Sequence, residues 1–215
     1  MDGVTAQLAE LPRRERRKRE LRGRIVDAAA QLFTARGFKA TRVAEICALA
    51  DVAEKTFFNH FPTKRDVLRE IADASVDQLR GDVEAVSAAS LSTEARLAAF
   101  FDHMAERIVS GGPRNRELVT ELVHVLNDSE DRSDRAELLL GAFGAIVEKG
   151  IDAGEVTRRH APETLTEMIL GAYYVLMFNY ANLDAFPIAE HAQASARFLA
   201  DALAPHPSET DTPED

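Results

Sequence analysis

The chain has 215 residues, 46% of them hydrophobic and 29% charged, and a formal net charge of −10. This length fits one large domain or two small ones, and the apolar fraction is enough to bury a core, so global disorder is excluded. The sequence has no run of 18 apolar residues and no signal-peptide order of charge followed by an apolar stretch. Its single cysteine, Cys47, excludes an internal disulfide and a cysteine-cluster metal site. We expect a soluble, cytoplasmic protein with no membrane partner.

Charge is divided unevenly along the chain. Residues 1–64 hold 13 Lys and Arg against 8 Asp and Glu, whereas residues 65–215 hold 13 against 28. A basic segment joined to an acidic body predicts that the N-terminal part contacts a polyanion or a membrane surface. A solvated charged helix would give the same balance, so charge alone does not decide between them.

The N-terminal third predicts one long helix followed by two short ones. An apolar stripe from Leu21 to Phe33 has helical spacing and ends at Arg36-Gly37, a cationic last turn followed by glycine. A short helix beginning at Thr41 or Arg42 and reaching Ala50 comes next. After a tight turn, another short helix runs from Glu54 to Phe61.

The remaining segments also have helical periodicity. Pro62-Thr63-Lys64 precedes a helix to about residue 89, and Ser92-Thr93-Glu94 opens one that Gly111-Gly112-Pro113 closes. Further helices are expected near 115–127, 133–150, 162–183 and 188–203. This gives about nine helices and no strand, so the fold class is all-α.

Two segments of the C-terminal half stand out by composition. Met168 to Phe178 is apolar all round yet too short to span a membrane, so it must be covered on several sides, most simply by a second subunit. Residues 205–215 are acidic and proline-rich, and we expect them to be disordered.

Residues 41–64 have the composition of a helix-turn-helix. Small Cys47 and Ala50 permit close helix approach, Val52 fills the turn, and Phe57 and Phe61 face inward. The opposite face of the second helix carries short polar side chains that can donate to phosphates or read base edges in the major groove. Those side chains are Lys55, Thr56, Asn59 and His60.

The block IVDAAAQLFTARGFKATRVAEICALADVAEKTFFNHFPTKRDVL, Ile25 to Leu68, resembles the DNA-binding domain of the TetR family of bacterial transcriptional regulators, the tetracycline-repressor-like or AcrR type. It matches the family patterns "LF..RGF", "T.V.EI", "V...TFF.HF" and "P.K..L". Gly154 to Ala181 resembles a later loop and helix of that family. Two positions depart from it: Phe58 stands where tyrosine is frequent, and Asp51 where the turn often has glycine.

The resemblance implies a DNA interface residue by residue. Thr41 and Arg42 would lie beside the DNA backbone at the start of the second helix, and Lys64 would meet a phosphate at the next helix N-terminus. The recognition helix would present Lys55, Thr56, Asn59 and His60. Arg13 to Arg24, with eight basic and two acidic residues, is interpreted as a basic helix extension or an arm that contacts phosphates or a minor groove. A solvated helical face remains its alternative.

No catalytic or metal motif stands out. Glu121 and His124 form an E-x-x-H pair of the kind found in di-iron bundles, but the sequence has no second pair. We therefore expect no enzyme activity, no metal and no cofactor. A helical di-iron metalloenzyme and a basic-headed interaction module remain as alternative functions.

A ligand pocket in the body is more plausible than an active site. Aromatic and methionine side chains that could line an apolar cavity recur on the predicted helices, although they suit an ordinary core equally well. Polar candidates could orient a ligand group. The full set of candidates is Phe100, His103, Met104, Arg107, His124, Asn127, Phe143, Tyr173, Tyr174 and Met177.

These observations predict a two-part regulator. Residues 1–64 would form the DNA-binding head and residues 65–204 an effector-binding and dimerisation body, with the helices near 162–183 and 188–203 pairing across a homodimer. The expected partners are a double-stranded palindromic operator, a second copy of the chain, and a small apolar or amphipathic effector that releases a repressor from DNA.

Overall fold

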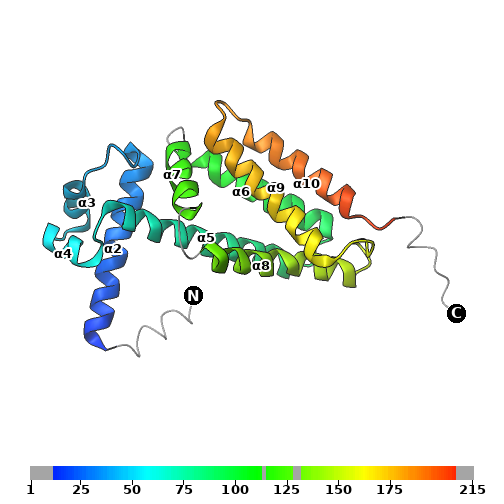
Figure 1. The fold of residues 1–215 in the computed structure, drawn as a ribbon, viewed down its shortest axis with the longest axis horizontal. Helices are drawn as coiled ribbons and strands as arrows, with labels where there is room; N and C mark the ends of the chain where they lie inside the picture. Colours follow the sequence, from blue (N-terminus) through cyan, green and yellow to red (C-terminus); the bar gives the residue numbers. More distant parts are fainter. Residues whose placement is uncertain (1–11, 113–114, 128–131, 207–215) are drawn as a thin grey trace. The chain divides into compact units, whose positions relative to one another are not determined.

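The computed structural model describes residues 12–112, 115–127 and 132–206, without the side chains of Asn127 and Arg132. Within these ranges the chain forms nine α-helices and no strand, which confirms the all-α prediction (Figure 1). The helices are α2 (Arg13–Arg36), α3 (Val43–Ala50), α4 (Glu54–His60), α5 (Lys64–Ala88), α6 (Thr93–Ser110), α7 (Asn115–Asn127), α8 (Arg132–Asp152), α9 (Pro162–Asn182) and α10 (Ile188–Leu203).

The chain divides into two compact units, Met1–Ile71 and Ala72–Asp215. The sequence prediction placed this boundary at residue 64, at the break before α5. The structure moves it into α5, because Val67, Leu68 and Ile71 of the first two turns are buried with the N-terminal helices. Helix breaks in the sequence show where helices start. The boundary between the two units depends instead on which hydrophobic core each turn of α5 packs into. Most of the tail expected at 205–215 lies outside the described residues.

The N-terminal unit is a small helical domain in which α2 packs on α3. Its core contains Ile25 and Phe33 of α2, Ile46 of α3 and Phe57 of α4, all fully buried. Helix α2 ends because Gly37 adopts a positive φ of 85°, and its N–H donates to the carbonyl of Phe33 at 2.8 Å. This glycine lets the chain turn back toward α3.

The C-terminal unit is a helical bundle in which α10 packs on α6, while α7 and α8 both pack on α9. Phe100, Phe101 and Phe143 form the aromatic centre of its core, with ring centroids of Phe100 and Phe143 5.1 Å apart. The loop before α9 is anchored by Glu155, which accepts hydrogen bonds from the backbone N–H and hydroxyl of Thr93 at 2.6 and 2.8 Å. A Cβ at Gly150 would lie 2.3 Å from Val156, so this close approach requires glycine.

Candidate DNA-binding interface and effector cavity

The turn between α3 and α4 is built around Asp51, which adopts a left-handed conformation with φ 53° and ψ 54°. Asp tolerates this region better than most residues, which explains how it replaces the expected glycine. The guanidinium of Arg24 donates to the carbonyls of Ala50 and Asp51 and lies 3.5 Å from the Asp51 carboxylate. Arg24 therefore offsets the negative charge that Asp51 adds near the interface.

Packing fixes which face of α4 points outward. Phe57 and, just after the helix, Phe61 are buried, as the sequence predicted, and they hold the helix against the domain. Lys55 and Asn59 are exposed on the other side, and Thr56 is half-buried. Phe58 is 50% exposed and its ring meets that of Phe57 edge-on at 5.3 Å. Helix α4 thus presents an amide, an ammonium and a flat apolar ring to the surroundings.

His60, at the end of α4, differs from its neighbours because it is half-buried and its Nδ1 has no hydrogen-bond partner. Burial, together with the positive charges of Lys18 and Arg22, holds the pKa of His60 below its usual value. The imidazole is consequently neutral near pH 7. In that form it can accept or donate one hydrogen bond at a base edge but contributes no charge toward phosphate.

The three residues expected beside the DNA backbone occupy different environments. Thr41 is 2% exposed, and its hydroxyl donates to the carbonyl of Gly37 at 2.8 Å. This side chain therefore makes its contacts inside the N-terminal unit. The ammonium of Lys64 donates to the carbonyls of Phe38 and Thr41 at 2.6 and 2.7 Å and lies over the Phe38 ring. Arg42 is exposed. At this corner the structure leaves Arg42 most accessible to a phosphate.

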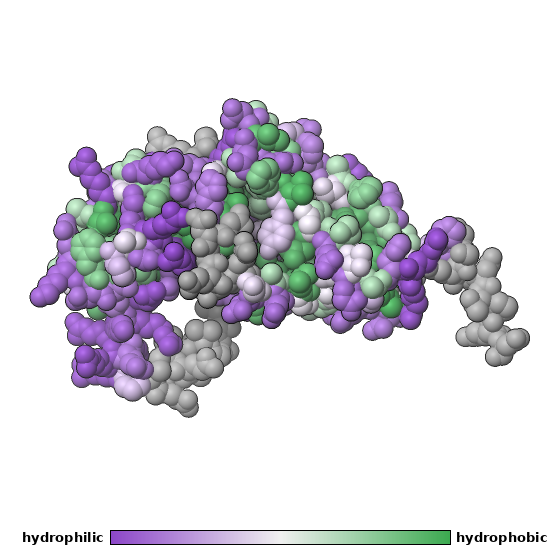
Figure 2. Space-filling view, viewed as in Figure 1, coloured by the Kyte–Doolittle hydropathy of each residue, from purple (hydrophilic) through white to green (hydrophobic). Residues whose placement is uncertain are grey.

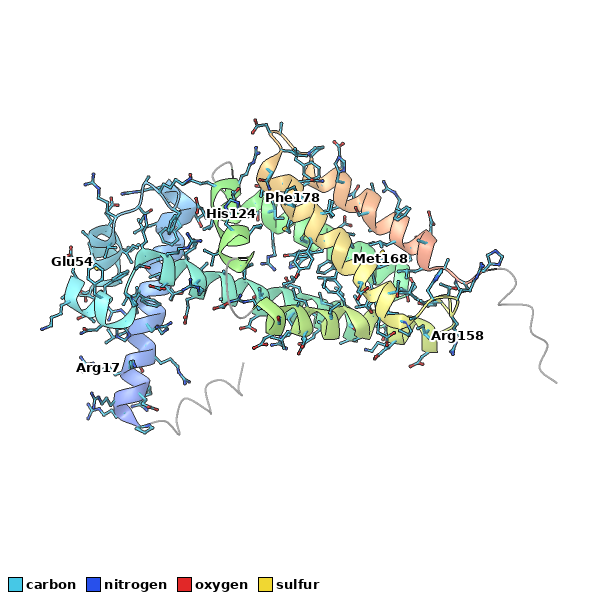
Figure 3. The ribbon with its side chains drawn as sticks, viewed as in Figure 1. Arg17, Glu54, His124, Arg158, Met168 and Phe178 are labelled. Carbon is cyan, nitrogen blue, oxygen red and sulfur yellow. The ribbon has the colours of Figure 1, made fainter. Side chains whose placement is uncertain are left out.

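The basic segment is the first part of α2, since the helix begins at Arg13. Residues 12–20 are all exposed, and Figure 3 shows Arg17 on this part of the helix. Two later cations are used inside the unit: Arg22 pairs with Glu70 and lies 4.2 Å from the centre of the Phe61 ring, and Arg24 holds the turn. Among residues 12–20, the exposed arginines are Arg13, Arg14, Arg16, Arg17 and Arg19.

The C-terminal unit contains a partly open cavity of about 530 Å³ between α5, α7, α8 and α9. This volume is within the range of pockets that hold small organic ligands. Its walls are mainly aliphatic and aromatic. The lining residues are Ser75, Val76, Leu79, Val123, Leu126, Ser133, Arg135, Ala136, Leu139, Tyr173, Tyr174, Met177 and Phe178.

Three of the ten predicted ligand residues, namely Tyr173, Tyr174 and Met177, lie in this wall. Phe100, Met104 and Phe143 belong instead to the core, where the ring of Phe100 meets that of Tyr173 at 6.2 Å. Phe100 therefore packs against Tyr173, a residue of the cavity wall. Burial raises the pKa of the Tyr173 hydroxyl, which stays protonated and can donate a hydrogen bond.

The polar candidates lie away from the cavity wall. Arg107 pairs with Asp82 of α5, and His103 lies 3.9 Å from the same carboxylate; both side chains are exposed. His124 is exposed on α7 (Figure 3), and the side chain of Asn127 lies outside the described residues. Among the residues described, no three His, Cys, Asp or Glu gather as metal ligands around Glu121 and His124 or elsewhere. Nothing in this part of the chain favours the di-iron alternative.

Sequence reasoning missed most of the cavity wall, including Arg135, Ser75 and Phe178. Arg135 lies in a strongly charged stretch of sequence at the start of α8, and charged helix residues are usually exposed to solvent. The only signal available was an apolar face on four separate helices, and which of these faces meet depends on the tertiary packing.

Residues 25–71 match the family model described as "Bacterial regulatory proteins, tetR family". Over the whole fold, the chain is similar to the crystal structure of the TetR-family transcriptional repressor FadR of Thermus thermophilus in complex with lauroyl-CoA. The identity is 25% and the TM-score 0.65, over 90% of this chain and 100% of that one. The N-terminal segment thus matches the TetR family model, and the whole fold is similar to that of a TetR-family repressor.

The curated proteins that are similar to this chain include transcriptional regulators. The transcriptional repressor KstR2 of Rhodococcus jostii is 28% identical over 135 residues, which span 60% of this chain and 66% of the repressor. The fatty acid metabolism regulator protein of Bacillus subtilis is 24% identical over 163 residues, spanning 73% of this chain and 81% of that protein. The similarity thus extends beyond the DNA-binding unit into the helical body.

In the described part of the chain, no helix is both long and apolar enough to cross a membrane.

Proposed function

We propose that the protein is a homodimeric transcriptional repressor that reads a near-palindromic DNA operator and is released from it by a small effector with an apolar body. The observation that carries the proposal is the outward polar face of α4 in a helix-turn-helix that matches the TetR family model. Lys55 and Asn59, four residues apart on that face, can both reach base edges in one major groove. Asn is suited to adenine and Lys to guanine.

Dimerisation is supported by an uncovered apolar groove along α9 and α10. Met168 and Phe198 line it together with Ala172 and Ala194, and their exposed fractions are 56% and 71%. Figure 2 shows hydrophobic side chains gathered over α9, on which Figure 3 labels Met168 and Phe178. Exposed apolar surface of this kind is usually covered by a partner. A dimer that binds both half-sites of a near-palindromic operator needs its two recognition helices about one DNA turn, roughly 34 Å, apart.

The effector assignment is supported by the cavity in the C-terminal unit and by the ligand of a structural relative. The cavity has a mainly apolar wall, and the Thermus thermophilus repressor was crystallised with lauroyl-CoA, which carries a long acyl chain. An effector that binds better to the DNA-free state shifts the population toward it, and the two affinities are linked reciprocally.

Selection from genomic DNA tests the regulatory function. The purified chain is mixed with sheared DNA from its source at physiological salt, and the retained fragments are sequenced. We expect enrichment of one or a few near-palindromic sites. Recovery of all fragments equally would contradict sequence-specific regulation.

Asn59→Ala gives the matched test of the recognition helix. Because Asn59 is exposed, we expect the variant to fold normally and to lose about 1–3 kcal/mol of discrimination at one position in each half-site. Glu190→Ala, an exposed residue in the first turn of α10, is the control. Identical site preferences in both variants would remove Asn59 from base recognition.

A further inference from the structure

An ion pair joins Arg135, in the wall of the effector cavity, to Asp73 of α5. The Nε of Arg135 on α8 donates to Oδ1 of Asp73 on α5 at 2.8 Å, and its Nη2 donates to the same oxygen. The Arg135 side chain is only 11% exposed, whereas that of Asp73 is 45% exposed. The cation is therefore held inside the protein and its counter-ion faces water.

Arg135 differs in charge from the rest of the cavity wall. Of the described residues that line the cavity, it alone carries a charge; the others are apolar or bear hydroxyl groups. Two serine hydroxyls, of Ser75 and Ser133, lie in the same wall. A guanidinium presents its N–H groups as a planar fork that matches a carboxylate or a phosphate.

We propose that the effector is an anionic amphiphile whose charged head pairs with Arg135 while its apolar body fills the cavity, and that Asp73 is a built-in competitor for the same guanidinium. This inference rests on the proposed function in taking the cavity as the effector site. The inference adds that the effector is an anion and that Arg135 is the residue that selects for its charge.

The exposure of the two partners makes the exchange physically reasonable. A buried guanidinium without an anion is costly, so Arg135 keeps a counter-ion in either state. Asp73 can be released to water at little cost because nearly half of its side chain is already solvated. An incoming head group thus replaces one carboxylate by another, and a neutral head group gains nothing from the exchange.

The exchange alters a contact on the helix that belongs to both units. Helix α5 runs unbroken from Lys64 to Ala88, with its first turns in the N-terminal unit. Glu70 pairs with Arg22 within that unit, and Asp73, three residues later, pairs with Arg135 within the other. Loss of the ion pair between Asp73 and Arg135 therefore removes a contact of α5 close to the residue at which the helix passes from one unit to the other.

The test compares two probes of equal chain length, decanoate and 1-decanol, by titration calorimetry on the full-length protein. We expect the wild type to bind decanoate about tenfold or more tightly than 1-decanol, the effect of one charge-assisted hydrogen-bond pair. Arg135→Gln should reduce that preference to near unity without weakening 1-decanol binding. Arg135→Lys, which keeps the charge but not the fork, should retain part of the preference.

Asp73→Asn tests the competitor. Removing the Asp73 carboxylate should tighten decanoate binding several-fold while leaving 1-decanol binding unchanged. Asp77→Asn is the matched control, because Asp77 lies one turn further along α5, is 70% exposed, pairs with Arg80 at 4.0 Å and does not line the cavity. Thermal melts show which variants are folded.

Three outcomes overturn the proposal: equal wild-type affinity for the two probes, an Asp73→Asn effect that Asp77→Asn reproduces, or no binding of either probe. Operator selection is run separately and without ligand. A protein that selects no operator yet prefers decanoate through Arg135 contradicts the proposed regulatory function and leaves the anion site intact. The reverse result removes only the anion site.

Discussion

Asp51 shows how a single backbone conformation supports the recognition helix. Its φ of 53° lies in the left-handed region, which most side chains enter at a cost of roughly 1–2 kcal/mol. Asp51→Ala should therefore lower the free energy of unfolding by about 1 kcal/mol, measured by urea denaturation. Asp51→Asn, which removes the same charge but tolerates this conformation, is the control. An equal loss in both variants would place the effect in the ion pair with Arg24 instead.

His60 gives the N-terminal unit a predictable pH dependence. Its pKa is lowered in the folded protein, because of burial and the nearby charges of Lys18 and Arg22. The unfolded chain therefore binds the proton first, so stability is full above about pH 6.5 and is lost as the pH falls toward the folded pKa.

The measurement for His60 is the free energy of unfolding between pH 7.5 and 5.5. The lowered carboxylate pKa values in the same unit, those of Glu45 and Asp66, act at more acidic pH. His60→Gln should flatten the curve in this window, whereas His191→Gln, an exposed histidine of α10, should not. A steep curve that persists in His60→Gln would contradict the assignment.

The basic start of α2 is an element whose role depends on charge rather than packing. Residues 12–20 are exposed, so their substitution should leave the fold intact. If the segment contacts phosphates, Arg16→Gln with Arg17→Gln should lower the slope of log binding constant against log salt by up to about 2 per protomer, without changing the preferred site.

Arg158→Gln with Arg159→Gln is the charge-matched control for that experiment, because both residues are exposed in the loop before α9. Slopes are measured for operator binding between about 50 and 200 mM salt. Equal slopes for the two double variants would assign the start of α2 to the solvated helical face that remained as its alternative.

At the scale of the whole molecule, the exposed groove of α9 and α10 predicts a dimer. Phe198 is 71% exposed there, and a charge at its position would face the second copy. Phe198→Glu should therefore convert the dimer into a folded monomer, measured by sedimentation, because an unpaired carboxylate buried in an apolar interface is strongly unfavourable. Val109→Glu on α6, at 61% exposure outside the groove, is the control. A Phe198→Glu protein that remains dimeric would place the interface elsewhere.

The sequence predicted local features well because they depend on neighbouring residues. The helical spacing from Leu21 to Phe33, the glycine after Arg36, and the inward Phe57 and Phe61 are all properties of a short segment. The family resemblance also rests on such a segment, the motif around α3 and α4. The uniform apolar character of Met168 to Phe178 is also a local feature, and it predicted that a second subunit covers this stretch. Part of the stretch is exposed in the single chain.

The all-helical class, the helix-turn-helix and the outward polar face of α4 could therefore be predicted from the sequence. Tertiary structure decided that Thr41 is buried, that Lys64 binds two carbonyls, and that the unit boundary falls inside α5. It also decided that Arg135, in a charged stretch of sequence, lies in an apolar cavity beside Asp73. The physical reason is that periodicity fixes which side of a helix is apolar, whereas a site forms where sides of distant helices meet, and that depends on packing across the whole unit.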